Sequence, residues 1–198
     1  MPDPYGPYDG GDLLEGSVRE YVADVERLGA AAFESCEWLR ELRLSGSVER
    51  APPVDVTGIN SRHYVAGAMA PLVIDRYRMP VDKGRGVPGE HELVWAVFFA
   101  EYSRNAANTV HGGALAAVCD YIGASVNGTT AWLRVNYLKG TPRSDQVVFK
   151  VCAWVTEVQQ NGRRERVEIE LSDGDTGLVM VTAEGEFVDV SMPRPARL

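Results

Sequence analysis

The chain has 198 residues and a formal net charge of -8, from 28 acidic and 20 basic side chains. Its length suits one domain with an appendage, and its content of 45% apolar and 24% charged residues is that of a globular protein. These values exclude a fibrous repeat and an extended disordered chain. An acidic surface would repel a polyphosphate backbone, so nucleic acid is a poor partner.

The three cysteines, Cys36, Cys119 and Cys152, lie far apart without a CxxC pair. Their odd number fits neither a disulfide framework nor a zinc site. The N-terminus has no basic residues ahead of an apolar stretch, and no segment reaches the roughly 18 apolar residues of a membrane span. We therefore expect a cytoplasmic protein without a metal site and without membrane contact.

The N-terminal third is expected to stand outside the main domain. Residues 1–16 are rich in Gly, Pro and Asp, which favours a flexible leader. Ser17 and Glu20 form a capping-box pattern, and apolar residues then recur at helical spacing, which predicts a long amphipathic helix to about Leu44. The rest of residues 17–70 has no sustained period and is interpreted as a wrapping connection.

Two strands and a short helix are predicted next. Residues 72–79 and 92–102 are enriched in branched and aromatic side chains and are separated by a Pro- and Gly-rich link. A helix is expected to begin near Gly112, because apolar residues then recur on one stripe. The residues of this core-facing stripe are Leu115, Val118, Cys119 and Ile122.

The C-terminal part predicts four strands. Leu133, Val135 and Tyr137 alternate with polar residues from Thr130 onward, and a similar alternation includes Ile169. Turns are expected at Asn161–Gly162, where both positions tolerate positive φ, and at residues 172–177.

The element order predicts an α+β fold. One helix inserted in an otherwise antiparallel meander favours a curved sheet wrapped around that helix. We assign this domain to residues 71–190, with a tail at residues 191–198. The sheet would have edges that a dimer could extend or cover.

Asp120 is the only formally charged residue between Arg104 and Arg134, and it lies in the helix expected to be most buried. Its helical neighbours, at three and four residues either way, are alanines and a glycine, so no cation on its own helix can pair with it. Such a carboxylate is a candidate general base or nucleophile. The alternative is an Asp at the helix rim, solvated or bonded to a backbone amide.

A loop with small residues leads into this helix. It runs from Asn105 to His111, Gly112 and Gly113. Free N–H groups at a helix start carry partial positive charge and could polarise a thioester carbonyl or hold its oxyanion. Asp120 follows about two turns later, close enough for a substrate carbonyl to sit between the two features if a facing strand closes the pocket.

These residues resemble the signature of PaaI-type hotdog thioesterases and the related human acyl-CoA thioesterases. The resemblance comprises His-Gly-Gly at His111, Asp120 nine residues after it and Asn105 six residues before it. The segment from Thr130 to Tyr137 is also similar to the next strand of that family. The resemblance covers roughly residues 71–190 and implies a hotdog fold that hydrolyses an acyl-CoA or acyl-carrier thioester.

The resemblance also implies roles for single residues. Asp120 would be the general base or nucleophile, Gly112 N–H the carbonyl polariser and Asn105 the positioner of water or substrate. Thr130 would be a hydroxyl partner, and His111 would shape the loop and hydrogen-bond near the thioester. The site would form at a dimer interface, with Asp and Thr from one subunit and Asn and His-Gly from the other.

Further expectations concern the substrate and the assembly. Coenzyme A would enter as part of the substrate, with no separate cofactor, and the protein would be a homodimer or a dimer of dimers. Substrate contacts are expected at Gly113 and Thr129, and at Arg163 and Arg164 toward coenzyme A phosphates.

The chain departs from the family pattern at three places. Asn108 stands where Gly is common, Gly140 stands where Pro is usual, and residues 123–128 are expected to end the helix early. The shortened helix end bears on the depth of the substrate pocket.

Alternatives remain open for several residues. His111 could simply begin the helix, Cys119 is better interpreted as a core residue than as a nucleophile, and the Arg163 segment could be a solvated strand end. Asp173–Gly174–Asp175 is interpreted as a turn, because further calcium ligands are missing.

Other functions also remain open. The rivals are a non-catalytic acyl-binding module, a ligand-sensing regulator and a dehydratase. Absence of GxSxG and Walker-type motifs argues against serine hydrolases and nucleotide hydrolases.

Overall fold

The computed structural model describes residues 27–45, 49–50, 72–80, 91–99, 105, 107, 109–141 and 147–191. The helices and strands in chain order are α2 (Glu37–Leu44), β1 (Glu49–Arg50), β2 (Leu72–Pro80), β3 (His91–Phe99), α4 (Gly112–Asn127), β4 (Thr129–Tyr137), β5 (Phe149–Gln159), β6 (Arg164–Asp173) and β7 (Val179–Val188).

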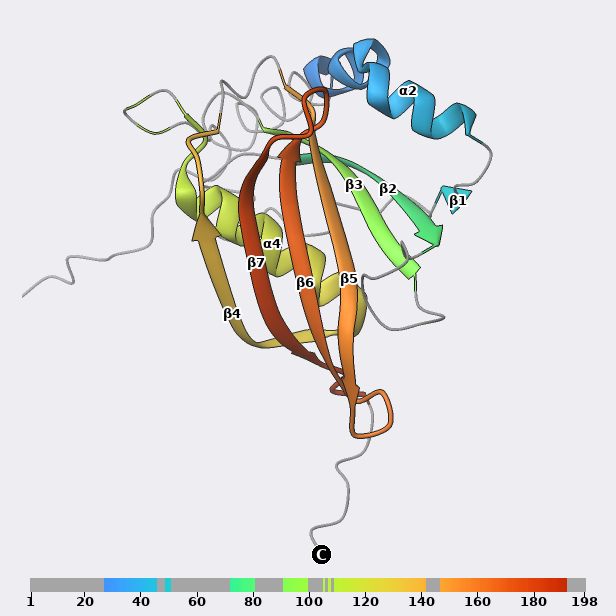
Figure 1. Ribbon diagram of the computed structural model, residues 1–198, viewed down its shortest axis with the longest axis vertical. Coiled ribbons are helices and arrows are strands. Elements are labelled where there is room, and N and C mark those ends of the chain that lie inside the picture. Colours follow the sequence, from blue (N-terminus) through green and yellow to red (C-terminus); the bar gives the residue numbers. More distant parts are fainter. Residues whose placement is uncertain are drawn as a thin grey trace, which may run out of the picture.

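Within these described residues, the strands form one seven-stranded antiparallel sheet in the order β1-β2-β3-β5-β6-β7-β4. α4 follows β3 in sequence and precedes β4, and these two strands bound the group that also contains β5, β6 and β7. The sheet curves around α4 (Figure 1). This is the α+β arrangement that the element order predicts, and it is the hotdog fold that the resemblance implies.

The helix packs into the sheet through the predicted apolar stripe. Leu115, Val118, Cys119 and Ile122 are all buried against residues of β3 and β5–β7. Fully burying one such aliphatic side chain contributes about 1.5–3 kcal/mol. Gly112 and Gly113 each cost about 1 kcal/mol relative to Ala in a helix. Burial of the stripe therefore outweighs the poor propensity of the first turn.

The predicted single helix up to about Leu44 is wrong at Cys36. Residues 27–35 are helical, Cys36 is extended at φ -76° and ψ 114°, and α2 begins at Glu37. Phe33, Cys36 and Leu39 are buried together in a second core on the outer face of the sheet. Packing of Cys36 into this core accompanies the break in the helix. The predicted capping box at Ser17 and Glu20 lies outside the described residues.

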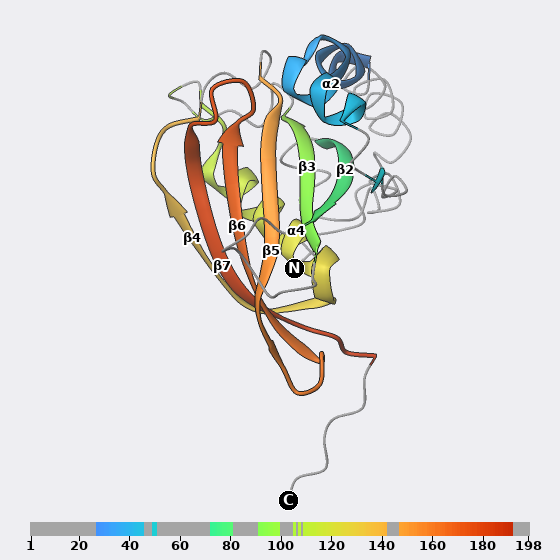
Figure 2. The same ribbon diagram turned by 45° about the vertical axis from the view of Figure 1, so that its right-hand side comes forward.

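This second core divides the outer face of the sheet into two parts. α2 packs beside β2, β3 and β5, whereas β7 and β4 lie at the far end of the strand order (Figure 2). Trp38 fits against Gly174, where an added Cβ would stand 1.8 Å from the indole nitrogen. The turn between β6 and β7 therefore requires glycine to receive α2.

The predicted strands are present, and the residues predicted to face the core in β6 do so. β2 and β3 match the first pair, although residues 100–102 lie outside the described part, and β4 to β7 match the four later strands. Val167, Ile169 and Leu171 are buried, as their alternation predicts. The expected plain connection before β2 contains the short β1, and its other residues lie outside the described part.

The turn before β6 and the end of α4 lie where they are predicted. Asn161 and Gly162 have positive φ as expected, and Gln160 joins them in a four-residue turn closed by Arg163 N–H donating to the Gln160 carbonyl. α4 ends within residues 123–128 as expected, because it continues to Asn127 and stops at Gly128 with φ 84°. Within the helix, Gly123 permits the close approach to the ring of Phe187.

Gly123→Ala should destabilise the protein by about 1–3 kcal/mol, because the new methyl would lie 1.9 Å from the buried Phe187 ring and overpack the core. Urea denaturation measures the free energy of unfolding. Gly140→Ala is the matched control, since its nearest neighbour is 3.7 Å away. Equal stability of the two variants would contradict this account of α4 packing.

Candidate active site

The start of α4 is shaped by His111. Its Nδ1 accepts a hydrogen bond of 3.0 Å from Gly113 N–H, and its carbonyl accepts from Ala114 and Leu115. An imidazole whose Nδ1 accepts a hydrogen bond has its N–H at Nε2, so the Nε2–H of His111 takes no part in this cap. Among the described residues, no acceptor pairs with Gly112 N–H. In the described part of the chain, the first turn of α4 therefore presents one amide that has no acceptor.

Asn105 organises the loop before this turn. Its Oδ1 accepts from the amides of Ala107 and Thr109 at 2.9 and 3.2 Å, and its Nδ2 donates to Thr109 Oγ1 at 2.8 Å. Val110 N–H donates to Thr141 Oγ1 in a buried contact of 3.1 Å. Asn105 thus holds the loop with three of its hydrogen bonds, and its predicted role toward water or substrate stays a prediction.

Asp120 is exposed in the described chain, so the prediction that it is buried is wrong. Leu115, Val118, Cys119 and Ile122 enter the core, whereas Asp120 is not part of it and is exposed. Its partner comes from the neighbouring strand as expected, because Thr130 Oγ1 donates to Asp120 Oδ1 at 2.6 Å. A charge-assisted bond of this length is strong and orients the carboxylate.

Tyr137 contacts the start of α4, which the sequence did not predict. Its hydroxyl donates to the Gly112 carbonyl at 2.8 Å, and its ring lies against the Gly112 backbone. In the sequence Tyr137 is only the last apolar position of a strand. The alternation of apolar residues along a strand does not predict which distant backbone carbonyl a tyrosine hydroxyl contacts.

The two predicted phosphate-binding arginines lie at the other end of the sheet from Gly112. Arg164 pairs with Val188, and Val188 pairs with Thr129, so Arg164 is level with the start of β4. Gly112 contacts Tyr137 at the end of β4. Arg164 forms an ion pair with Glu186, which offsets its charge. Arg163 belongs to the turn before β6, and its Nε is buried without a partner in the described part of the chain.

The three thiols are free and buried. Burial, and then the nearby Asp120 charge, raises the pKa of Cys119 to about 12, and burial raises the pKa of Cys152 to about 12 as well. Burial also raises the pKa of Cys36. A neutral buried thiol is a poor nucleophile, which supports the interpretation of Cys119 as a core residue.

The turn at residues 173–177 is held by its own aspartate, because Asp173 Oδ1 accepts from the amides of Asp175 and Thr176 at 2.9 Å each. Across the described ranges, no three acidic, histidine or cysteine side chains gather as metal ligands. None of the helices in those ranges is long and apolar enough to cross a membrane.

The structure therefore brings the predicted residues together in two groups. His111, Gly112 and Gly113 form the helix start, and Asp120 and Thr130 form a carboxylate–hydroxyl pair farther along the same helix. Eight residues of helical rise separate Gly112 from Asp120 by about 12 Å along the axis. The first group can hold a developing oxyanion, and the second can take a proton or attack an electrophile.

Comparison with known proteins gives likenesses among solved structures only. No family model and no curated protein matches the sequence. A thioesterase superfamily protein is 21% identical with a TM-score of 0.45, and the alignment covers 57% of this chain and 55% of that one. This chain thus spans little more than half of that protein's length.

Two further structures come from named organisms. The Escherichia coli PaaI protein from the phenylacetic acid degradation operon is 14% identical over 67% of this chain and 88% of that one, with a TM-score of 0.48. A hypothetical thioesterase from Streptococcus pneumoniae TIGR4, solved with coenzyme A, is 21% identical over 50% and 82%, with a TM-score of 0.45. Because these sequence identities and TM-scores are low, the fold assignment rests on the strand order of this chain itself.

Proposed function

We propose that the protein hydrolyses an acyl thioester, an acyl-CoA or an acyl-carrier thioester, to a free acid and a thiol. The observation that carries the proposal is that one helix holds both groups: a Gly112 N–H at its start that no described residue accepts, and the Asp120–Thr130 pair farther along. The amide stabilises negative charge on the carbonyl oxygen, and the carboxylate supplies the base or nucleophile. Coenzyme A takes part as a portion of the substrate, not as a separate cofactor.

The reaction needs no further reagent than water. Thr130 occupies one oxygen of the Asp120 carboxylate, and the other oxygen accepts a proton from water as the water oxygen bonds to the acyl carbon. The carbonyl electron pair moves to the oxygen held by Gly112 N–H and then returns, and the carbon–sulfur bond breaks. The proton on Asp120 passes to the departing sulfur. Direct attack by Asp120 would instead break the carbon–sulfur bond, expel a thiolate and form an anhydride. Water then cleaves the anhydride to the free acid and protonated Asp120, which passes its proton to the thiolate.

Two subunits are needed to assemble this site. A reacting carbonyl lies about 3 Å from the groups that act on it, whereas Gly112 and Asp120 of one chain are separated by about 12 Å of helical rise. A second copy whose helix runs in the opposite direction places its Gly112 near Asp120 of the first. Asn105 and His111 then act from the same side as Gly112.

The sheet edge at β4 is suited to this pairing. β4 bonds to β7 along one side, and no described strand occupies its other side. The strand is nine residues long, and it leaves Trp132 and Tyr137 exposed to 40% and 54%. A long edge strand with exposed aromatic rings is a surface that proteins ordinarily cover. Pairing of two β4 strands would also cover Asp120.

The coenzyme A phosphates are assigned to the turn before β6. Arg163 is the better candidate, since Arg164 pairs with Glu186. Gly113 and Thr129 are assigned to substrate contact because they adjoin the helix start and the Thr130 hydroxyl. The site is assigned to a cytoplasmic homodimer or dimer of dimers.

Asp120→Asn should lower kcat by about 10²–10⁴-fold, because the amide cannot accept the proton from water. Glu168→Gln removes an exposed carboxylate from the outer face of β6 and serves as the control, with kcat unchanged. Thiol release from short, long and aromatic acyl-CoAs is measured. If Asp120→Asn retains the turnover of the parent protein, the assignment of Asp120 is wrong. Tight acyl-CoA binding without thiol release by the parent protein would favour an acyl-binding module instead.

Gly112→Pro should lower kcat by about 10²–10³-fold, because it removes the N–H that holds the oxyanion. Proline is tolerated at the first position of a helix, and His111 already has the extended conformation, φ -63° and ψ 133°, that a residue before proline requires. Gly112→Ala is the matched control, since it keeps the N–H and its methyl lies at 3.4 Å from the Tyr137 ring. Equal activity of the two variants would remove Gly112 N–H from the mechanism.

Mixing the two inactive variants tests the shared site. A mixed dimer of Asp120→Asn and Gly112→Pro chains holds one intact site and one doubly altered site, so random exchange should restore about a quarter of the parent activity. Each variant is also assayed alone under the same exchange conditions. Recovery confined to the mixture supports a site built from two chains. No recovery in a mixture shown to contain mixed dimers would contradict it.

A further inference from the structure

The first turn of α4 is intrinsically weak. Gly112 and Gly113 are poor helix formers, and no acidic residue in this turn compensates the helix dipole. Its side-chain cap is the bond from Gly113 N–H to His111 Nδ1. Because helix ends fray, the direction of the Gly112 amide depends on restraints from outside the helix.

β4 supplies such a restraint through Tyr137. The hydroxyl of this last residue of β4 donates to the carbonyl of Gly112, the first residue of α4, at 2.8 Å. The ring also packs on Gly112, because an added Cβ there would lie 3.4 Å from the ring carbon that bears the hydroxyl. The side chain therefore fastens the first turn both by a hydrogen bond and by contact.

The hydroxyl is a dependable donor in this position. Partial burial of the hydroxyl end raises the pKa of Tyr137, and the nearby Cys119 raises it further. The phenol therefore keeps its proton throughout the neutral range. Tyr137 as a residue is 54% exposed and is not part of the larger core.

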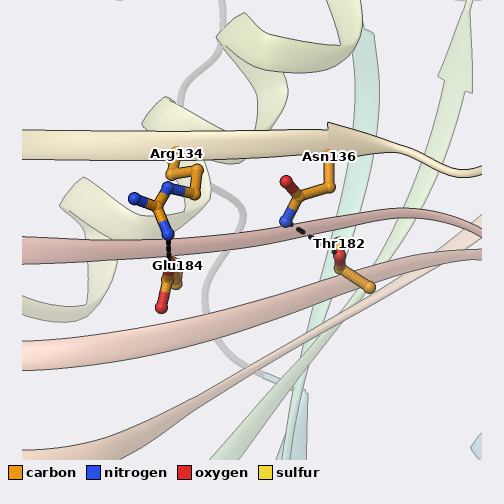
Figure 3. Close-up of polar contacts among 4 residues, drawn as sticks. All are labelled: Arg134, Asn136, Thr182 and Glu184. Carbon is orange, nitrogen blue, oxygen red and sulfur yellow. Dashed lines mark hydrogen bonds and ion pairs between the residues drawn. The ribbon is translucent and has the colours of Figure 1, made fainter.

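Two other polar side chains of β4, those of Arg134 and Asn136, contact β7 and not α4. Arg134 donates to Glu184 at 2.9 Å and Asn136 donates to Thr182 at 3.4 Å, which links β4 to β7 on the outer face of the sheet (Figure 3). Exposed contacts of this kind contribute about 1 kcal/mol or less. Asn136 precedes Tyr137 and lies on the opposite face, so it offers a matched control.

We infer that Tyr137 is a positioning residue that holds the first turn of α4 and thereby aims Gly112 N–H at the carbonyl oxygen of the substrate. This inference deepens the proposed function and rests on it for the identity of the reaction. The hydrogen bond itself is independent of that reaction. Since β4 also carries Thr130, one strand sets the position of the amide and the orientation of the carboxylate.

Tyr137→Phe removes the hydroxyl and keeps the ring. We expect kcat to fall about 5–10-fold with KM within about twofold of the parent value, because the oxyanion contact strengthens in the transition state. Asn136→Ala should leave both constants unchanged. A rise in KM at constant kcat would show that Tyr137 contacts substrate instead, and would overturn the positioning role.

A second measurement does not depend on activity. Hydrogen exchange of the Gly113 and Ala114 amides, followed by NMR, should become several-fold faster in Tyr137→Phe and stay unchanged in Asn136→Ala. Unchanged exchange in Tyr137→Phe would overturn the inference, whatever the activity. Faster exchange in a protein that hydrolyses no thioester would support the restraint and reject only the proposed function. Urea denaturation of both variants checks that the rest of the fold is intact.

Discussion

The packing of α4 into the concave face of the sheet is the constraint on which the rest of the structure depends. Its apolar stripe supplies the centre of the larger core, and Gly123 permits the close approach to Phe187. Once that face is fixed, the opposite face, which carries Asp120, must be presented outward. The exposure of a candidate catalytic carboxylate is thus a consequence of helix burial and not an independent property of the aspartate.

The edge strand β4 supplies the side chains that contact both candidate groups of α4. Two hydroxyls from β4 reach α4, where Thr130 contacts the Asp120 carboxylate and Tyr137 contacts the Gly112 carbonyl. The same strand leaves one side without a described partner. Pairing at this edge would act on both contacts at once. Assembly and chemistry are therefore coupled through one strand in our proposal, which gives a physical reason for a site shared between copies.

The outer face of the sheet has a different role. α2 covers the part formed by β2, β3 and β5, and Trp38 reaches the turn at Gly174. The remaining part carries exposed ion pairs such as Arg134–Glu184 and Arg166–Glu157. Such pairs contribute little to stability, but they keep this face polar and solvated. Asp120 has no charged neighbour within its own helix.

Much of the fold follows from the sequence alone, because helical and strand periods are local properties. The stripe around Leu115 and Ile122, the alternation at Ile169 and the turn at Asn161–Gly162 each predict the structure that is found. The tertiary structure alone decided the break at Cys36, the exposure of Asp120, the pairing of Arg164 with Glu186 and the contact of Tyr137 with Gly112. Each of these depends on which distant segment lies opposite, and strand register and helix packing determine that, whereas residue spacing does not.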